Sequence, residues 1–382
     1  MQGLKAKNVL FVTGSFPPEV GGIQNYVYNL CKYSRHHVTV LAPHYKGDAS
    51  FDAEQNFQIV RKDFLRRKNF LLSGFNLLKE VFQLVRNNQI DLIVCNHVLV
   101  STIGNVIGFI TKKPFICITY GKDTLEFLNN FLLKQIVHMN LRKAKHIITC
   151  SNYTKQIVEG LINSTNKVSS VLPGVDPKFK PMVKNQKLLE KYDLHDKKIL
   201  FTVGRLVERK GHDMVIKALP DCINKIPNLV YLIIGDGEYA DQLKTLVKEL
   251  DLEGHVKFVG KIDEDELVDF YNLGDVFIMP CRFVEDKGSV EGFGIVFLEA
   301  AACRKPIIGG NSGGAPEAVG VEGTGLLVDP LNTKEISESI TRIFEHPSLA
   351  NEMADKAYER VHQEFSYEKL SEKLDNIISE IC

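Results

Sequence analysis

The chain has 382 residues, of which 44% are hydrophobic and 25% are charged. This composition is typical of a soluble globular protein and excludes a disordered one, and the length exceeds what one hydrophobic core usually organises, so two domains are expected. The formal net charge is zero, but residues 1–172 carry 21 Lys and Arg against 10 Asp and Glu. The basic excess of that half predicts that one domain meets an anionic partner.

No apolar run approaches the roughly 18–20 residues that cross a bilayer, and the N-terminal stretch does not resemble a signal peptide, so a cytoplasmic location is expected. The eight cysteines form no C-x-x-C pair and show no metal-like spacing with histidine. We therefore expect buried free thiols in a reducing compartment.

Short, fully apolar runs alternate with helical patterns along the whole chain, which predicts an α/β protein with parallel sheets covered on both faces. In the first half, strands are expected at "NVLFVTG", "HVTVLAP", "DLIVCN", "PFICITYG" and "HIITCSN". In the second half they are expected at "KKILFTVGR", "LVYLIIGDG", "HVKFVG", "DVFIMP", "KPIIGG" and "GLLVD". The pattern restarts near residue 198, after a segment rich in Pro, Lys and Asp. Two Rossmann-like domains facing across a cleft are therefore predicted, with the junction near 173–181.

A pair of glycines follows the first predicted strand, in "VTGSFPPEVGGIQNYVYNL". Gly21 and Gly22 would enter a helix whose first amides have no backbone partner and carry the positive end of the helix dipole. This arrangement suits a phosphate group, because glycine allows close backbone approach. An ordinary loop-to-helix turn is the alternative.

A cluster of cations interleaved with apolar residues lies in "RKDFLRRKNFLL", where the cations are Arg61, Lys62, Arg66, Arg67 and Lys68. Cations attract anionic headgroups and apolar side chains enter the interface, so the cluster predicts peripheral contact with a membrane surface. The alternative is a solvated loop followed by an ordinary amphipathic helix. A nucleic-acid partner is not expected, because no recognition motif accompanies the charge.

The first strand of the second half runs into "FTVGRLVERKGHDM". Arg205 follows the strand, and Lys210 precedes a helix start near Gly211 and His212. Two cations beside a helix N-terminus suit a diphosphate, whose charge they would stabilise as a glycosyl bond breaks. The alternative is an exposed Arg/Lys pair.

The stretch "IIGDGEY" contains Gly235 and Gly237 but has Ala240 where a dinucleotide fingerprint needs its third glycine. A lone GxG is a weak signal, so no nicotinamide cofactor is expected.

Two carboxylates, Glu291 and Glu299, flank or enter the buried helix predicted in "EGFGIVFLEAAAC". Eight residues of helix span about 12 Å. This exceeds the ~5–9.5 Å that separates the acid and base of a glycosidase. The spacing therefore favours two hydroxyl-rich ends of one ligand, such as the hexose and the ribose of a nucleotide sugar. A salt-bridged core glutamate is the alternative for Glu299.

The motifs "GSFPPEVGGIQNY", "GRLVERKG", "EGFGIVFLEA" and "SGGAPEAV" together resemble those of the retaining family 4 glycosyltransferases of the GT-B fold. Within that family the chain is most similar to bacterial phosphatidylinositol-mannoside mannosyltransferases, and the similarity covers nearly its whole length. The resemblance implies an acceptor-binding domain over 1–173, joined by a crossover helix at about 366–382. It implies a donor-binding domain over 174–365.

The resemblance also implies roles for individual residues. Arg205 and Lys210 would hold the donor diphosphate, Glu291 would contact the donor sugar, and Glu299 would contact the ribose. The turn at Gly21 and Gly22 would reach the distal phosphate. The remaining residues expected in the donor site are Gly204, Lys261, Ile262, Gly292, Phe293, Gly294 and Ile295, of which Lys261 and Ile262 would face the nucleobase.

The chain departs from the family where "TYGKD" stands in place of the usual "HG". Tyr120 replaces a histidine that lies beside the reacting sugar, and a tyrosine can donate a hydrogen bond there but does not act as an imidazole. Three alternatives follow: the role is only positional, or Lys122 or Asp123 shares it and faces the acceptor, or the acceptor differs. The groups expected in catalysis are Arg205, Lys210, Glu291 and Tyr120.

The implied reaction is transfer of a hexose from a nucleotide-diphospho sugar, with GDP-mannose favoured over a UDP-hexose, to a lipid-linked or membrane-associated acceptor. No cofactor and no metal are expected, and the protein would work at the inner face of the membrane. A sugar-nucleotide epimerase or hydrolase is an alternative, as is a non-catalytic sugar-nucleotide-binding subunit. Product analysis with and without acceptor separates these alternatives.

Overall fold

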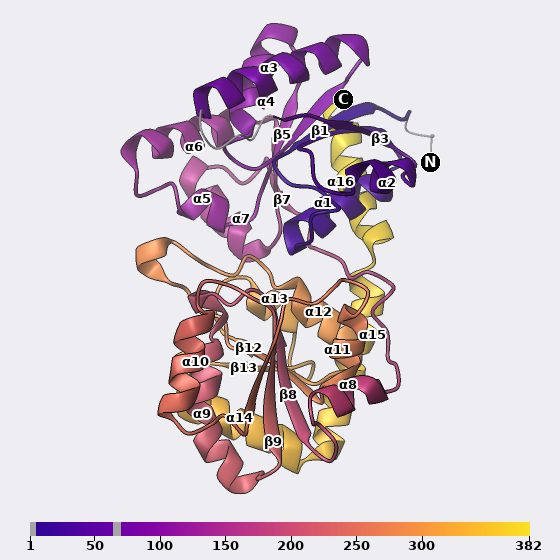
Figure 1. Ribbon diagram of the computed structural model, residues 1–382. Coiled ribbons are helices and arrows are strands. Elements are labelled where there is room, and N and C mark those ends of the chain that lie inside the picture. The colour runs from indigo at the N-terminus through magenta and orange to yellow at the C-terminus, as the bar shows by residue number, and fades with distance from the viewer. Residues whose placement is uncertain (1–4, 64–69) are drawn as a thin grey trace. The chain divides into compact units, whose positions relative to one another are not determined.

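The computed structural model describes residues 5–63 and 70–382, with the backbone alone for 70–73, and these residues form two compact units (Figure 1). Unit 1 comprises Met1–Pro173 and Tyr367–Cys382, and unit 2 comprises Gly174–Ser366. Unit 1 carries 23 Lys and Arg against 14 Asp and Glu, so the basic excess of the sequence belongs to this unit.

Unit 1 is built on a parallel sheet of seven strands in the order β3-β2-β1-β4-β5-β6-β7. The strands are β1 Asn8–Thr13, β2 His37–Ala42, β3 Gln58–Arg61, β4 Leu92–Asn96, β5 Phe115–Thr119, β6 His146–Thr149 and β7 Val168–Ser170. The helices are α1 Gly22–Lys32, α2 Asp48–Ala53, α3 Phe70–Asn87, α4 Ser101–Thr111, α5 Lys122–Leu125, α6 Phe131–Lys143, α7 Asn152–Ile162 and α16 Tyr367–Ile381.

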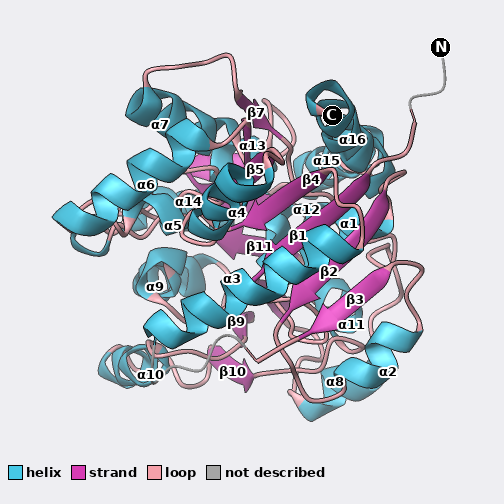
Figure 2. Cartoon of the chain, turned by 90° about the horizontal axis from the view of Figure 1, so that it is seen from above, coloured by secondary structure: helices cyan, strands magenta, loops and turns pink. Residues whose placement is uncertain are grey.

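The central strands of unit 1 are buried on both faces, as their continuous apolar sequences require. On one face, α3, α4, α6 and α7 share a single core with the sheet, built from residues such as Val81, Ile107, Val137 and Val158 (Figure 2). Elsewhere in the unit, α1 packs against α16.

Unit 2 has a parallel sheet of six strands in the order β10-β9-β8-β11-β12-β13. The strands are β8 Lys198–Val203, β9 Leu229–Ile234, β10 Val256–Gly260, β11 Val276–Met279, β12 Ile307–Gly310 and β13 Leu326–Val328. The helices are α8 Gln186–Lys191, α9 His212–Lys225, α10 Ala240–Glu249, α11 Leu267–Leu273, α12 Ile295–Ala302, α13 Ala315–Val319, α14 Thr333–Glu345 and α15 Pro347–Glu364, with single 3₁₀ turns η1 Glu208–Lys210 and η2 Glu285–Lys287.

The prediction of two Rossmann-like domains with parallel sheets is confirmed, and all eleven predicted strands are present. The sequence analysis missed β3 and β7, which are the two edge strands of the unit 1 sheet. Edge strands are short and have one neighbour, so "QIVR" and "VSS" need no long apolar run. The eight cysteines are free thiols, and seven are buried as expected, whereas Cys382 is exposed.

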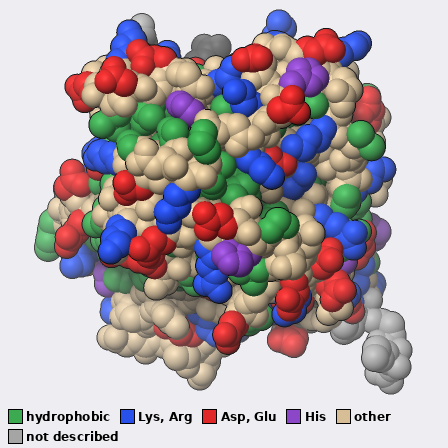
Figure 3. Space-filling model, turned by 90° about the horizontal axis from the view of Figure 1, so that it is seen from below, with side chains coloured by type: hydrophobic (Ala, Val, Ile, Leu, Met, Phe, Trp, Pro, Cys, Tyr) green, Lys and Arg blue, Asp and Glu red, His purple; other side chains and the backbone are tan. Residues whose placement is uncertain are grey.

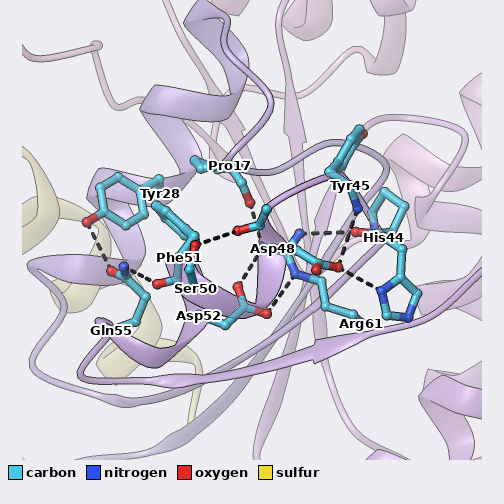
Figure 4. A network of polar contacts seen from close by, with 12 residues as sticks. Pro17, Tyr28, His44, Tyr45, Asp48, Ser50, Phe51, Asp52, Gln55 and Arg61 are labelled. Carbon is cyan, nitrogen blue, oxygen red and sulfur yellow. Dashed lines mark hydrogen bonds and ion pairs between the residues drawn. The ribbon is translucent and has the colours of Figure 1, made fainter. Parts of the chain in front are cut away.

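Arg61 ends β3 and does not belong to a membrane-facing surface, which corrects the sequence prediction. Its side chain is only 5% exposed, and its guanidinium donates to both carboxylate oxygens of Asp52, at 3.0 and 2.7 Å. It also donates to the carbonyl oxygen of Pro17 (Figure 4) and to that of Pro43. Its cation lies over the ring of Phe16. Arg61 therefore joins α2 to the loops that follow β1 and β2. Its neighbour Lys62 pairs with Glu80, and Arg66, Arg67 and Lys68 lie outside the described residues.

Replacing Arg61 by Met should lower the free energy of unfolding by about 2–4 kcal/mol, because Asp52 and two carbonyls would lose a buried charged donor. Urea unfolding followed by circular dichroism measures the loss. The matched control is Lys62→Met, which removes a half-exposed ion pair at 3.1 Å and should cost less than about 1 kcal/mol. Equal losses in the two variants would contradict a structural role for Arg61.

Candidate functional site

The candidate site in unit 2 lies where the chain direction across the sheet reverses. From β8 the chain proceeds to β9 and β10 on one side, and later returns to β11, β12 and β13 on the other. The loops that follow β8 and β11 therefore leave the carboxyl edge of two adjacent strands in opposite directions, which opens a crevice for a ligand in sheets of this kind.

The loop after β8 carries a short run of cations into the start of α9. It passes through Gly204 and Arg205 and the turn η1, and α9 begins at His212, as predicted. Gly211 has φ +76°, and a Cβ atom there would lie 2.2 Å from the carbonyl oxygen of Pro280. Only glycine fits this left-handed position, so it brings the cation loop against the end of β11.

Lys210 and Glu291 form a buried ion pair between these two loops. The Nζ atom of Lys210 lies 2.7 Å from Oε2 of Glu291, and their side chains are 9% and 12% exposed. Burial alone would raise the pKa of Glu291, but the charges of Lys210, Arg209 and Arg205 hold this pKa below its usual value. Glu291 is therefore a carboxylate at neutral pH.

The loops hold more positive than negative charge. Nε of Arg209 lies 3.7 Å from Oε2 of Glu291, and the exposed Arg205 lies two residues after the end of β8 and three residues before η1. Nε of Arg209 is buried and has no hydrogen-bond partner within the described part of the chain. Arg205, Arg209 and Lys210 surround the one carboxylate of Glu291, whereas Glu208 of the same loop pairs with Lys287. The site beside the N-terminus of α9 is therefore net positive, which suits a phosphate-bearing ligand.

A second buried pair fixes the two loops to each other. Arg282, in the loop after β11, donates to both carboxylate oxygens of Asp213 in the first turn of α9, at 2.8 and 3.1 Å. The backbone amide of Arg282 also donates to the carbonyl oxygen of Arg209, at 2.8 Å. This bidentate pair holds the loop of Lys210 and the loop of Glu291 in register.

Residues Glu291 to Gly294 form the glycine loop that the sequence predicts ahead of a buried helix. Gly294 has φ +94° and precedes α12, which begins at Ile295. The amide of Gly314 donates to the carbonyl oxygen of Glu291, at 2.9 Å, and a Cβ atom on Gly314 would lie 2.0 Å from the carbonyl oxygen of Gly292. The "NSGGAPEAV" segment therefore supports this loop directly. The side chain of Phe293 turns inward and packs on Phe365.

Glu299 is buried in α12, four residues past its start, so the span from Glu291 to Glu299 is half loop and half helix. The hydroxyl of Tyr271 donates to Oε2 of Glu299, at 2.5 Å. Burial raises the pKa of Glu299 to about 7, against the opposing effects of the Tyr271 hydrogen bond and of Lys178. The Glu299 carboxyl therefore changes protonation near neutral pH.

The glycines of "IIGDGEY" have a packing role. A Cβ atom on Gly235 would lie 2.0 Å from the carbonyl oxygen of Gly204, and one on Gly237 would lie 2.4 Å from that of Leu206. The segment after β9 therefore packs closely against the loop that follows β8, and only glycine fits at these two positions. This packing explains the GxG pattern without a dinucleotide.

The remaining donor-site predictions lie at the carboxyl edges of the sheets. Lys261 and Ile262 follow β10, with Lys261 exposed and Ile262 half-buried. In unit 1, Gly21 and Gly22 stand at the start of α1, as the sequence predicts. Their contacts with a ligand stay predictions.

Tyr120 follows β5 in unit 1, and its side chain is buried. Its hydroxyl donates to Oδ1 of Asn96, and its pKa is raised well above the usual value by burial and by the nearby Tyr26. Lys122 pairs loosely with Glu126, at 3.8 Å. The catalytic role of Tyr120 stays a prediction.

Asp123 lies just after Tyr120, and its contact with an acceptor stays a prediction. Its carboxylate is buried and accepts from the hydroxyl of Thr119 and from the amide of Tyr120, at 2.8 and 2.7 Å. A third donor is the amide of Val98, at 3.3 Å. Asp123 therefore fixes the turn that places Tyr120.

The sequence analysis missed Arg209, Tyr271 and the pair of Arg282 with Asp213. Arg209 adjoins Lys210, and the doublet "RK" before a glycine is a signal that could have included it. Tyr271 lies on a buried face of α11 and shares no motif with Glu299, so only the fold brings the two together.

Two family descriptions match the chain, one for each half. Residues 20–179 match Glycosyltransferase Family 4, and residues 184–360 match Glycosyl transferases group 1. Among the described residues, no group of three or more His, Cys, Asp or Glu is arranged to hold a metal ion. In the same part of the chain, we find no helix with the length and hydropathy of a membrane span.

Relatives of similar length are known. The chain is 29% identical to the GDP-mannose-dependent alpha-(1-6)-phosphatidylinositol monomannoside mannosyltransferase of Mycobacterium tuberculosis, over 97% of each chain. It is 28% identical, over 98% of each chain, to the GDP-mannose-dependent enzyme of Corynebacterium glutamicum that acts on the monoacylated monomannoside. Anabaena HepE, solved with UDP and glucose, has the same fold, with a TM-score of 0.82 and 20% identity over 98% of this chain and 100% of that one.

Proposed function

Since the chain belongs to the family 4 glycosyltransferases of the GT-B fold, we propose that it transfers mannose from GDP-mannose to a lipid-linked acceptor with retention of anomeric configuration. That it is a glycosyltransferase follows from its family; the donor, the acceptor and the stereochemistry are the proposal. The observation that carries it is the buried contact of Lys210 with Glu291, at the reversal point of the unit 2 sheet.

The cations of the β8–α9 loop would hold the donor diphosphate. Lys210 and Arg209 approach Glu291 from this loop, and Arg205 is exposed at its beginning. When the glycosyl bond breaks, the diphosphate gains negative charge, and fixed cations stabilise that charge more strongly than the charge of the bound donor. These side chains supply the electrophilic assistance, so the proposal needs no metal.

Glu291 would contact hydroxyl groups of the donor sugar. Because Lys210 and its neighbours keep it ionised, it accepts hydrogen bonds from hydroxyls and does not donate a proton. The same ion pair aligns the sugar-contacting carboxylate with the diphosphate-contacting ammonium. The ion pair would therefore position both groups that the breaking bond joins, the donor sugar and the diphosphate.

In the proposed reaction the acceptor oxygen attacks the anomeric carbon from the face that the diphosphate leaves. The bond from the anomeric carbon to the phosphate oxygen breaks through an oxocarbenium-like state, and the departing phosphate oxygen takes the acceptor proton. The products are the glycosylated acceptor and GDP, so atoms and charge balance without a strong protein base. Tyr120 would lie on the acceptor side of this reaction.

Glu299 would bind the ribose. Its carboxyl is buried, and the Tyr271 hydroxyl occupies one of its oxygens, leaving acceptor capacity for a diol. Lys261 and Ile262 would border the nucleobase. The choice of guanosine and mannose rests on the names of the Mycobacterium and Corynebacterium relatives, and the choice of a lipid acceptor rests on the same names and on the basic character of unit 1.

Calorimetric titration of the purified chain with GDP, UDP, GDP-mannose and UDP-glucose tests the proposal. We expect selective micromolar binding of GDP and GDP-mannose. Selective UDP binding would keep the transferase and overturn the donor, whereas binding of none of the four would overturn the donor site. Product analysis then completes the test: consumption of GDP-mannose only with added lipid acceptor supports transfer, and an isomerised or hydrolysed sugar without acceptor contradicts it.

A further inference from the structure

The helices that cover one face of the unit 1 sheet carry large apolar side chains on their solvent side. α3, α4 and α6 bury their inner sides in one core with the sheet. Their outer sides expose Phe75, Val106, Phe109, Ile110, Phe131 and Leu132, with Phe109 77% and Phe131 74% exposed. A single exposed apolar residue is ordinary, but six on three helices of one layer are not.

The exposed apolar side chains of α4 form a continuous strip. Val106, Phe109 and Ile110 are spaced by three and four residues, so they lie on one side of the helix. Lys112 follows directly, and its Nζ lies 5.0 Å from the centroid of the Phe109 ring. The ammonium of Lys112 therefore lies at the edge of the apolar strip. There it can stay in contact with water or lipid headgroups when the strip itself is buried.

The same helices are nearly free of acidic residues. The sequences of α4 and α6 contain no Asp or Glu, and α3 contains only Glu80, which pairs with Lys62. Cations on or directly after these helices are Lys79, Arg86, Lys112, Lys134, Arg142 and Lys143. By contrast, the face of the molecule in Figure 3 shows acidic and basic side chains interspersed.

We propose that the outer side of α3, α4 and α6 lies on an anionic lipid bilayer, with Phe109 and Ile110 entering the headgroup boundary. This inference rests on the proposed function only in that a lipid-linked acceptor requires an approach to a membrane. It moves the contact away from Arg61, which is buried, to a surface that no motif in the sequence marks.

The composition of the layer favours a membrane over a protein partner. Protein–protein interfaces are depleted in Lys, whereas helices that lie in a membrane interface combine Lys and Arg on the polar face with Phe and Leu on the other. Each cation near an anionic surface adds attraction that salt screens. A bilayer can also bury six separated apolar side chains, because a fluid lipid surface does not need a shape-matched pocket for each of them.

Co-sedimentation of the full chain with phosphatidylcholine vesicles, with and without about 30% phosphatidylglycerol, tests the inference. We expect binding that needs the anionic lipid and weakens as salt rises from 0.1 to 0.5 M. The double variant Phe109→Asp/Ile110→Asp should bind at least about tenfold more weakly, because it replaces inserted apolar area by repelled charge. The matched control is Val321→Asp/Leu331→Asp, which changes two exposed apolar residues of unit 2 and should bind as the unchanged chain does.

Circular dichroism and the GDP titration verify that both variants are folded. Equal vesicle binding by the unchanged chain and the Phe109/Ile110 variant would overturn the inference, as would binding that ignores lipid charge and salt. A dimer in sedimentation equilibrium that the variant dissociates would assign the surface to a second copy instead. Failure of GDP binding with intact vesicle binding would refute the proposed donor but not this surface.

Discussion

Replacing Lys210 by Ala is expected to lower turnover by about 10²-fold or more. The variant removes a cation that would stabilise the leaving diphosphate, and losses of this size are typical when one transition-state charge contact is removed. It also leaves Glu291 buried without its 2.7 Å partner. The pKa of Glu291 should therefore rise, and the remaining activity should decline as the pH is lowered, because the protonated form no longer serves as a carboxylate acceptor.

Steady-state kinetics over a range of pH, with GDP-mannose and a lipid acceptor, measure this effect. Lys217→Ala is the matched control, since Lys217 lies on α9, the helix that follows Lys210, with its side chain 47% exposed, and the change should leave turnover unchanged. Arg205→Ala should also lower turnover, as the second cation of the site. Normal rates in both the Lys210 and Arg205 variants would place the diphosphate elsewhere.

Replacing Glu299 by Gln is expected to weaken GDP binding about 10- to 100-fold at pH 8, because a hydrogen bond to a charged acceptor would become one to a neutral acceptor. The loss should shrink as the pH falls. Burial raises the pKa of Glu299 to about 7, so the unchanged chain itself loses the carboxylate below neutrality. Its GDP affinity should therefore rise with pH through 7, and that of the Gln variant should be flat.

The same pKa shift predicts that the free energy of unfolding falls as the pH rises, whereas the GDP affinity rises with pH. Between about pH 4.5 and 7 the folded state of the free protein holds a proton on Glu299 that the unfolded state has released. The contribution of this group is complete below pH 4.5 and is lost as pH rises toward 7, by about 3 kcal/mol in all. Urea unfolding across this range, compared with Glu299→Gln, isolates the contribution of this group to stability.

For the binding prediction, an unchanged GDP affinity in the Glu299→Gln variant at pH 8 would contradict the assignment of Glu299 to the ribose.

The central strands and the cation loop were predictable because their signals are local. A strand such as "LIVCN" is apolar up to its last residue because both of its faces are covered, and Lys210 stands directly before a glycine that starts a helix. The edge strands β3 and β7 lack this signal, since an edge strand in this sheet is partly polar.

Interactions between distant segments were not predictable from the sequence. Tyr271 meets Glu299 across 28 residues, and Arg282 meets Asp213 across 69. Neither pair has a spacing rule, because the fold and not the local backbone sets the distance. Arg61 shows the opposite error: its position in a basic run suggested a surface, but β3 directs its side chain into the unit.

The return of α16 to unit 1 determines when that unit can be completed during synthesis. Asp375 of α16 accepts hydrogen bonds from the hydroxyl of Ser34 and from the amide of Arg35, and Leu374 and Ile378 are buried. The ribosome must translate all of Gly174–Ser366 before this helix emerges. At ordinary elongation rates, about 10 to 40 s therefore pass between synthesis of the first 173 residues and synthesis of α16. During this time the surface that α16 covers is exposed. Unit 2 is contiguous in sequence and has no such delay, so the later-made half of the protein can finish folding first.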